Sequence, residues 1–130
     1  MPAFCIAAGY LALVSGCSSP RQTIPAQTIT AGDLKAVVTP EINPPTIGDN
    51  TLDLNLTDST GVGVPIANIS ATATTPLTGN TGATESGRSQ GNGSYRIPIH
   101  TPLTEKYTVT ITIERTGKSD VVMTYIIQPQ

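Results

Sequence analysis

The sequence predicts an all-β protein: an immunoglobulin-like β-sandwich of about seven antiparallel strands, preceded by a signal peptide and a flexible tether. Apolar and polar residues alternate with a period of two in several short segments, and turn residues separate these segments at regular intervals. No segment shows a convincing helical period. The composition agrees with this class, since threonine, glycine and proline are abundant and only 12% of the residues are charged.

The expected strands follow one another without long helical connections. They cover residues 34–39, 51–57, 66–74, 94–99, 106–115 and 120–128, with a short strand near 83–86. The clearest is 51–57, in which Leu52, Leu54 and Leu56 alternate with polar residues. The last strand is apolar at both alternating positions, so the pattern leaves its register open. The residues between Thr74 and Gly93 are expected to be mostly loop because they include four glycines and one bulky apolar residue.

The N-terminal segment predicts export and a lipid anchor. Residues 3–14 form an apolar run of the length of a signal-peptide core, too short to span a bilayer as a helix. The small residues that end the run, followed by Cys17, resemble the bacterial lipobox, in which the thiol is acylated, for example by palmitate. No Lys or Arg precedes the run, although signal peptides normally begin with one. The alternative is a buried cysteine in an N-terminal helix or strand.

These features divide the chain into three parts. Residues 1–16 are the expected lipoprotein signal peptide, 17–33 the lipidated tether and 34–130 the sandwich domain. The expected location is the cell envelope, with the domain anchored to a membrane through the lipid on Cys17 and facing the periplasm or the exterior. The net charge of -2 and the lack of a basic cluster argue against a nucleic-acid partner.

Metal binding and catalysis have few candidate residues. His100 and Met123 are the only histidine and methionine after Cys17, and they need a third ligand such as Glu105, or a second molecule, to hold a metal. We expect His100 to be exposed at a strand end, Met123 to lie in the core, and no cofactor to be bound. The chain has no GxSxG nucleophile elbow, and we expect no enzymatic activity.

Three carboxylates suggest a second, weaker metal candidate. Asp49, Asp53 and Asp58 provide oxygen ligands of the kind that calcium prefers. The simpler interpretation is a set of solvated strand and turn residues.

Three stretches resemble a known family: NPPTIGDNTLDLNLTDSTGVGVPIANIS, GNGSYRIPI and KYTVTITIE. They are similar to the YtkA-like domain, which includes FixH-like proteins, and the resemblance covers residues 34–127. It implies a small β-sandwich and an association with copper handling or cytochrome oxidase maturation. Many members carry methionines, which suit Cu(I), in the loop corresponding to residues 74–87. This chain has none there.

The expected function is therefore that of a membrane-anchored, non-catalytic cell-envelope lipoprotein whose sandwich binds or supports an envelope protein. The expected contact surface is the loop at residues 74–91, because a rigid sandwich positions its loops for binding. The alternative is a copper-handling or cytochrome oxidase maturation accessory protein. A carbohydrate-binding or adhesion module is disfavoured because tryptophan is absent.

Overall fold

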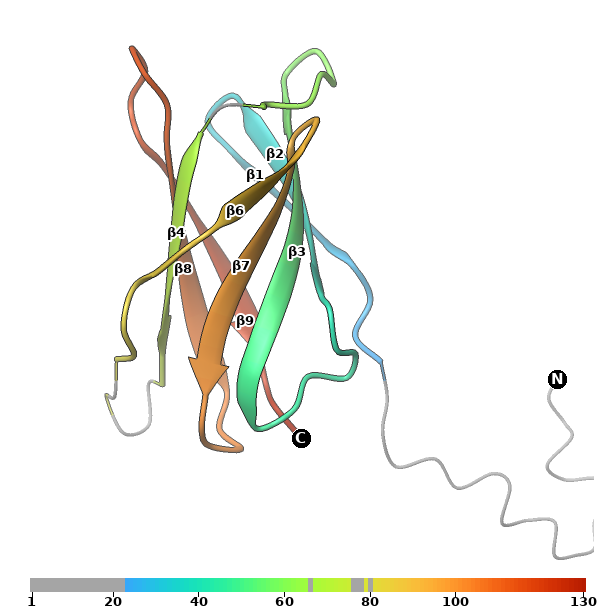
Figure 1. Ribbon diagram of the computed structural model, residues 1–130, viewed down its shortest axis with the longest axis vertical. Helices are drawn as coiled ribbons and strands as arrows, with labels where there is room; N and C mark the ends of the chain where they lie inside the picture. Colours follow the sequence, from blue (N-terminus) through green and yellow to red (C-terminus); the bar gives the residue numbers. More distant parts are fainter. Residues whose placement is uncertain (1–22, 66, 76–78, 80) are drawn as a thin grey trace, which may run out of the picture.

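The computed structural model describes residues 23–65, 67–75, 79 and 81–130. Two antiparallel sheets pack face to face, which confirms the predicted all-β sandwich (Figure 1). In the five-stranded sheet the order is β1 (Gln27–Ala31), β2 (Leu34–Pro40), β3 (Gly48–Asp58), β7 (Ser94–Thr101) and β6 (Arg88–Gly91). In the four-stranded sheet the order is β5 (Glu85–Ser86), β4 (Asn68–Thr74), β8 (Tyr107–Glu114) and β9 (Val121–Ile127).

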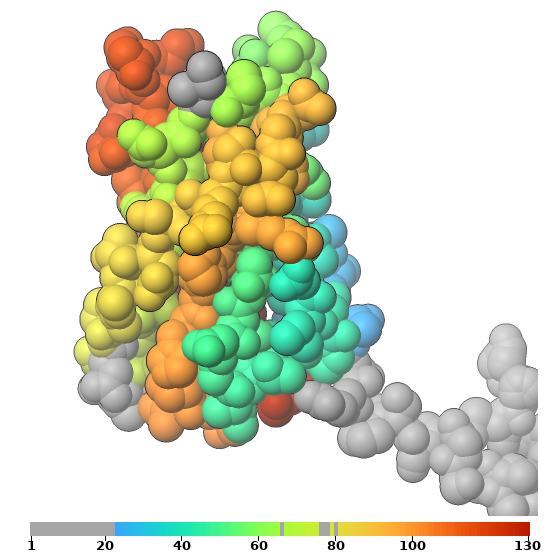
Figure 2. Space-filling view, viewed as in Figure 1, coloured from blue at the N-terminus to red at the C-terminus, as the bar shows by residue number. Residues whose placement is uncertain are grey.

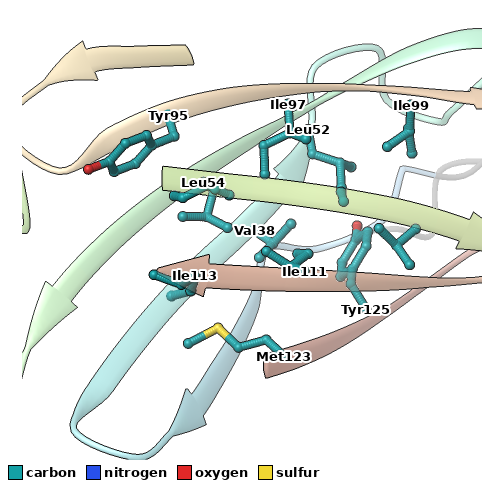
Figure 3. Packing of buried hydrophobic residues seen from close by; sticks show 14 of the residues in the cluster. Val38, Leu52, Leu54, Tyr95, Ile97, Ile99, Ile111, Ile113, Met123 and Tyr125 are labelled. Atoms are coloured by element: carbon teal, nitrogen blue, oxygen red, sulfur yellow. The ribbon is translucent and has the colours of Figure 1, made fainter. Parts of the chain in front are cut away.

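The core lies between the sheets and consists of the inward positions of the long strands. Leu52, Leu54 and Leu56 of β3 are fully buried, as their alternation predicts. In β9 the structure settles the register that the sequence leaves open: Met123 and Tyr125 point inward, whereas Val122 and Ile126 remain exposed. Figure 3 shows Tyr125 and Met123 with apolar side chains of both sheets.

The sandwich begins earlier than the expected boundary at residue 34. Residues 27–31, expected in the tether, form β1 and pair with β2 from Gln27↔Val38 to Ala31↔Leu34. The sequence signal is weak because Ile29 is the only bulky apolar residue of this strand, and it is only half-buried. Further along the chain, residues 88–91 were expected in a loop and instead form β6, which pairs with β7.

The chain changes sheets at Gly87. This residue separates β5 of one sheet from β6 of the other, and its N–H donates to the Ile69 carbonyl over 2.7 Å. A Cβ atom here would lie 3.0 Å from Ile97 Cγ1 and 3.4 Å from Ile69 Cβ, so a side chain would require these neighbours to shift by a few tenths of an ångström. Figure 2 shows the segment that makes this crossing, in yellow, on the surface beside β7.

A second close approach joins the β3–β4 connection to the β6–β7 turn. There is no room for a side chain at Gly93, because a Cβ atom would lie 2.5 Å from the Leu56 carbonyl oxygen. The φ angle of Gly93 is +85°, which also favours glycine. The Leu56 N–H donates to the Gly93 carbonyl over 2.7 Å. Beside this contact the Tyr95 hydroxyl donates to the Val64 carbonyl over 2.6 Å. The glycine and the tyrosine of the GNGSY stretch therefore hold one end of the sandwich together.

The opposite end receives the N-terminal part of the chain. Ile24 donates its N–H to Asn43 Oδ1 over 2.7 Å, and Asn43 Nδ2 donates back to the Ile24 carbonyl over 2.8 Å. Nearby, Asn50 is buried and bonds Thr46 and Thr101, which fixes the β2–β3 connection. The β4–β5 and β7–β8 connections and the C-terminus lie at this same end (Figure 1). We call it the entry end.

Candidate functional site

The predicted lipidation site lies outside the described residues. Cys17 and the whole of the predicted signal peptide belong to the segment 1–22, so their prediction stands on the sequence alone. The described residues include no helix long and apolar enough to cross a membrane.

The structure does not bring His100 and Met123 together. His100 is exposed on the outer side of β7, where its Nδ1 lies 2.8 Å from Asp49 Oδ1 across the β3–β7 pair. Met123 is buried in the core on β9 of the other sheet. One side chain faces solvent and the other faces the interior, so they cannot bind the same metal ion within one molecule. Glu105, the suggested third ligand, lies in the β7–β8 connection.

The three aspartates have separate partners along β3. Asp49 contacts His100, and Asp53 Oδ1 lies 3.3 Å from Arg96 Nε. Asp58 closes its own turn by accepting from the Thr60 hydroxyl over 2.6 Å, which, with two backbone N–H groups, lowers the pKa of this carboxyl. Asp49 and Asp53 are four residues apart, about 13 Å along a strand. The described residues hold no group of three or more histidine, cysteine or acidic side chains suited to a metal.

These ionisable side chains give the five-stranded sheet a charged outer face. Besides Asp49 and His100 it carries Asp53 and Arg96, and Arg96 Nη2 also reaches Glu41 Oε2 over 2.9 Å. All of these groups are at least partly exposed. Pairs of this kind are screened by water and contribute little to stability.

A stronger ion pair closes the end of the sandwich opposite to the entry end. Arg115, which follows β8, makes two hydrogen bonds to the Asp33 carboxylate, of 2.7 and 3.1 Å, and its side chain is 11% exposed. The Arg115 hydrogen bonds lower the pKa of Asp33 to about 2. An open depression of about 460 Å³ lies beside this pair, between the β1–β2 turn and the loop that begins at Asp58. Asp33 therefore joins the first hairpin to the β8–β9 turn.

The four-stranded sheet presents a different outer face. Apart from Glu114 at the end of β8, the outward side chains of β4, β8 and β9 carry no ionisable group. Three rows cross β4, β8 and β9, and their members pair in register. The rows are Ser70–Thr112–Val122, Thr72–Thr110–Thr124 and Thr74–Thr108–Ile126. On the β5 side, Ser86 pairs with Ser70, and the Thr84 hydroxyl bonds that of Thr72 over 2.8 Å. We call this surface the hydroxyl face.

The hydroxyl face combines hydrogen-bonding capacity with low desolvation cost. Threonine and serine hydroxyls both donate and accept, and removing them from water costs far less than removing a charge. Neighbouring positions lie about 4.7–4.9 Å apart between strands and two residues apart along each strand, which gives a regular surface. Val122 and Ile126 are 55% and 43% exposed and add two apolar patches along β9.

The sequence carried a signal for this face. In TVTITIE the threonines alternate with the core residues Val109, Ile111 and Ile113, so a strand assignment already places them together on the outside. The strand pairing that aligns them with β4 and β9 is not readable from the sequence. The expected binding loop at 74–91 is smaller than predicted, since β5 and β6 occupy part of it, and residues 76–78 and 80 lie outside the described set.

Comparisons with known proteins support the fold. Neither a family model nor a curated protein matches the chain. Among solved structures it is similar to a DUF4426 family protein from Pseudomonas aeruginosa PAO1, with a TM-score of 0.57 and 14% sequence identity. The match covers 81% of this chain and 96% of that chain. At this identity the likeness shows a shared β-rich fold and nothing about activity.

Proposed function

We propose that the protein is a lipid-anchored, non-catalytic protein of the cell envelope whose sandwich binds a partner protein. The observation that carries the anchor is Cys17 placed directly after an apolar run that ends in small residues. The partner-binding role is supported by the hydroxyl face, a regular uncharged surface beside exposed Val122 and Ile126.

The length of chain between the proposed anchor and the sandwich limits the distance of the sandwich from the membrane. Ile24 is held to Asn43 by two hydrogen bonds, and it lies seven residues after Cys17 in the sequence. Seven residues span at most about 25 Å when fully extended. In this proposal the entry end, with the β4–β5 connection, stays close to the membrane.

The position of the hydroxyl face fits this arrangement. The face runs along the length of the sandwich on β4, β8 and β9 rather than at the entry end, so a partner can approach it from the side. Its partner needs a neutral surface with hydrogen-bonding groups, because an uncharged face offers no compensation for a buried charge. This surface replaces the loop at 74–91 as the favoured contact site.

We also propose that the sandwich is a YtkA-like domain. A small β-sandwich is the fold that this family implies, and Gly93 and Tyr95 of the matching stretch GNGSYRIPI hold one end of the fold together. The associated copper role has no support from His100 and Met123, because His100 is exposed on the outer side of β7 whereas Met123 is buried in the core.

Mass spectrometry of the protein made in its natural host tests the anchor. We expect a chain that begins at Cys17 and carries acyl groups, and membrane association that is lost in Cys17→Ser. An unmodified N-terminus on a freely soluble protein would refute the anchor. For the partner surface, a photo-reactive residue at Thr110 on the hydroxyl face is compared with one at Thr51 on the charged face. We expect one defined protein adduct from Thr110, and equal labelling from both positions would refute this choice of surface.

A further inference from the structure

Strand β9 is an edge strand that lacks the usual protection against pairing. Within the described residues it pairs with β8 alone, although β1 of the other sheet lies close to it. Its seven residues, VVMTYII, include no charge, proline or glycine, and its pairing with β8 has no irregularity. Unpaired N–H and C=O groups on such a strand are a template for another strand.

The other edge strands each carry a protecting feature. Strand β5 has two residues, and β6 has four and is interrupted by a register shift between Ser89 and Gly91. Strand β6 also carries Arg88, and β1 has five residues of which only Ile29 is bulky and apolar. Short, charged or irregular edges resist pairing with other chains. The contrast singles out β9.

The outward side chains of β9 are symmetric about Thr124. Val122 lies two residues before it and Ile126 two residues after it, and both are exposed. If the strand pairs antiparallel with its own copy, with Thr124 opposite Thr124, each Val122 lies opposite an Ile126. On the inner side Met123 then lies opposite Tyr125, so the two cores adjoin. Every side chain meets one of matching polarity, and no like charges are brought together.

We propose that β9 pairs antiparallel with β9 of a second copy of this chain, centred on Thr124. The pairing joins the two four-stranded sheets into one of eight strands and doubles the hydroxyl face. It covers the exposed parts of Val122 and Ile126, and it gives partners to backbone groups that the isolated edge leaves to water. A partner strand from another protein would gain the same backbone bonds, but the symmetry about Thr124 favours a second copy.

The pairing has a consequence for anchoring, which rests on the proposed lipid at Cys17. Antiparallel strands place the two Ile24 residues at opposite ends of the joined sheet. Both anchors then reach one membrane when the strands lie along its surface, within the reach of about 25 Å that seven residues allow.

Sedimentation of the full chain over a range of concentrations tests the pairing, with detergent present if the chain carries a lipid. We expect a dimer, and Thr124→Lys should raise its dissociation constant at least about fivefold because two lysines then lie directly opposite each other. Thr110→Lys is the matched control: it is the cross-strand neighbour of Thr124 on β8, and it should leave the dimer intact. An equimolar mixture of the Thr124→Lys and Thr124→Glu chains should dimerise again.

Three results would overturn the proposal. The first is a wild-type chain that stays monomeric at every concentration, which would instead favour a strand of another protein as the partner of β9. The second is a dimer that Thr110→Lys dissociates as strongly as Thr124→Lys, because this indicates stacking of two hydroxyl faces. The third is a dimer that Thr124→Lys does not weaken.

Cross-linking in the membrane gives an independent readout. Opposite residues of an antiparallel pair have Cβ atoms about 4.5–5.5 Å apart, close enough for a disulfide after a small adjustment. Thr124→Cys should therefore form a reducible dimer under mild oxidation, whereas Thr110→Cys, in a chain with the same other cysteines, should not. Equal cross-linking of both variants would contradict pairing at β9.

Discussion

Removing the hydroxyl groups of Tyr95 and Tyr125, one at a time, is expected to change stability in opposite directions. Both rings are buried in the core, and burial raises the pKa of both phenols. The Tyr95 hydroxyl donates to the Val64 carbonyl over 2.6 Å. The Tyr125 hydroxyl is buried and has no hydrogen-bond partner among the described residues. The two Tyr→Phe substitutions therefore remove the same atom from different surroundings.

The magnitudes follow from the cost of burying a polar group. Tyr95→Phe removes a hydrogen bond and leaves the Val64 carbonyl without its donor, which should lower the free energy of unfolding by about 1–2 kcal/mol. Tyr125→Phe removes a buried hydroxyl that costs about 1–3 kcal/mol when unpaired, less a small loss from the void that remains. It should raise the free energy of unfolding by about 1 kcal/mol. The two variants should thus differ by about 2–3 kcal/mol.

Urea unfolding followed by far-UV circular dichroism measures this difference. The slopes should match that of the wild type, since neither substitution changes the surface exposed on unfolding, and the midpoints should move in opposite directions. If Tyr125→Phe destabilises the protein as much as Tyr95→Phe does, then the Tyr125 hydroxyl has a partner and the reasoning fails.

Three further predictions concern the ends and the charged face. Gly93→Ala should strongly lower the free energy of unfolding, because the added Cβ would meet backbone atoms. Gly117→Ala, at a similar φ of +78° but with open space around its Cβ, should lower it by about 1 kcal/mol. Equal losses of melting temperature in the two variants would refute the close approach at Gly93. Asp33→Asn should lower the melting temperature at neutral pH. Because the pKa of Asp33 is lowered from 3.8 to about 2, its contribution is complete above pH 3.8 and is lost as the pH falls through 2, so the variant and wild-type melting temperatures should converge there. Cu(I) titration should give no stoichiometric binding, and binding abolished by His100→Ala would revive a copper role.

The local features of the fold were predictable from the sequence. Period-two alternation identifies the inward residues of β3, β7 and β8, because a strand turns successive side chains to opposite sides whatever its neighbours are. The same alternation failed for β9, where Val121 and Val122 are both apolar and only packing chooses which one is buried. It also missed β1, since Ile29 alone carries too little apolar surface to indicate a strand before its pairing with β2 is known.

The arrangement of the sites depended on tertiary structure. The order of strands in the sheets places His100 on an outer face and Met123 in the core, and it aligns the threonines of β8 with those of β4 and β9. It also leaves β9 at an edge. These facts come from contacts between residues far apart in the chain, which alternation within one segment does not record. The sequence alone determined the strand class, the inward faces of β3, β7 and β8, and the placement of Cys17 after an apolar run, because each depends only on neighbouring residues.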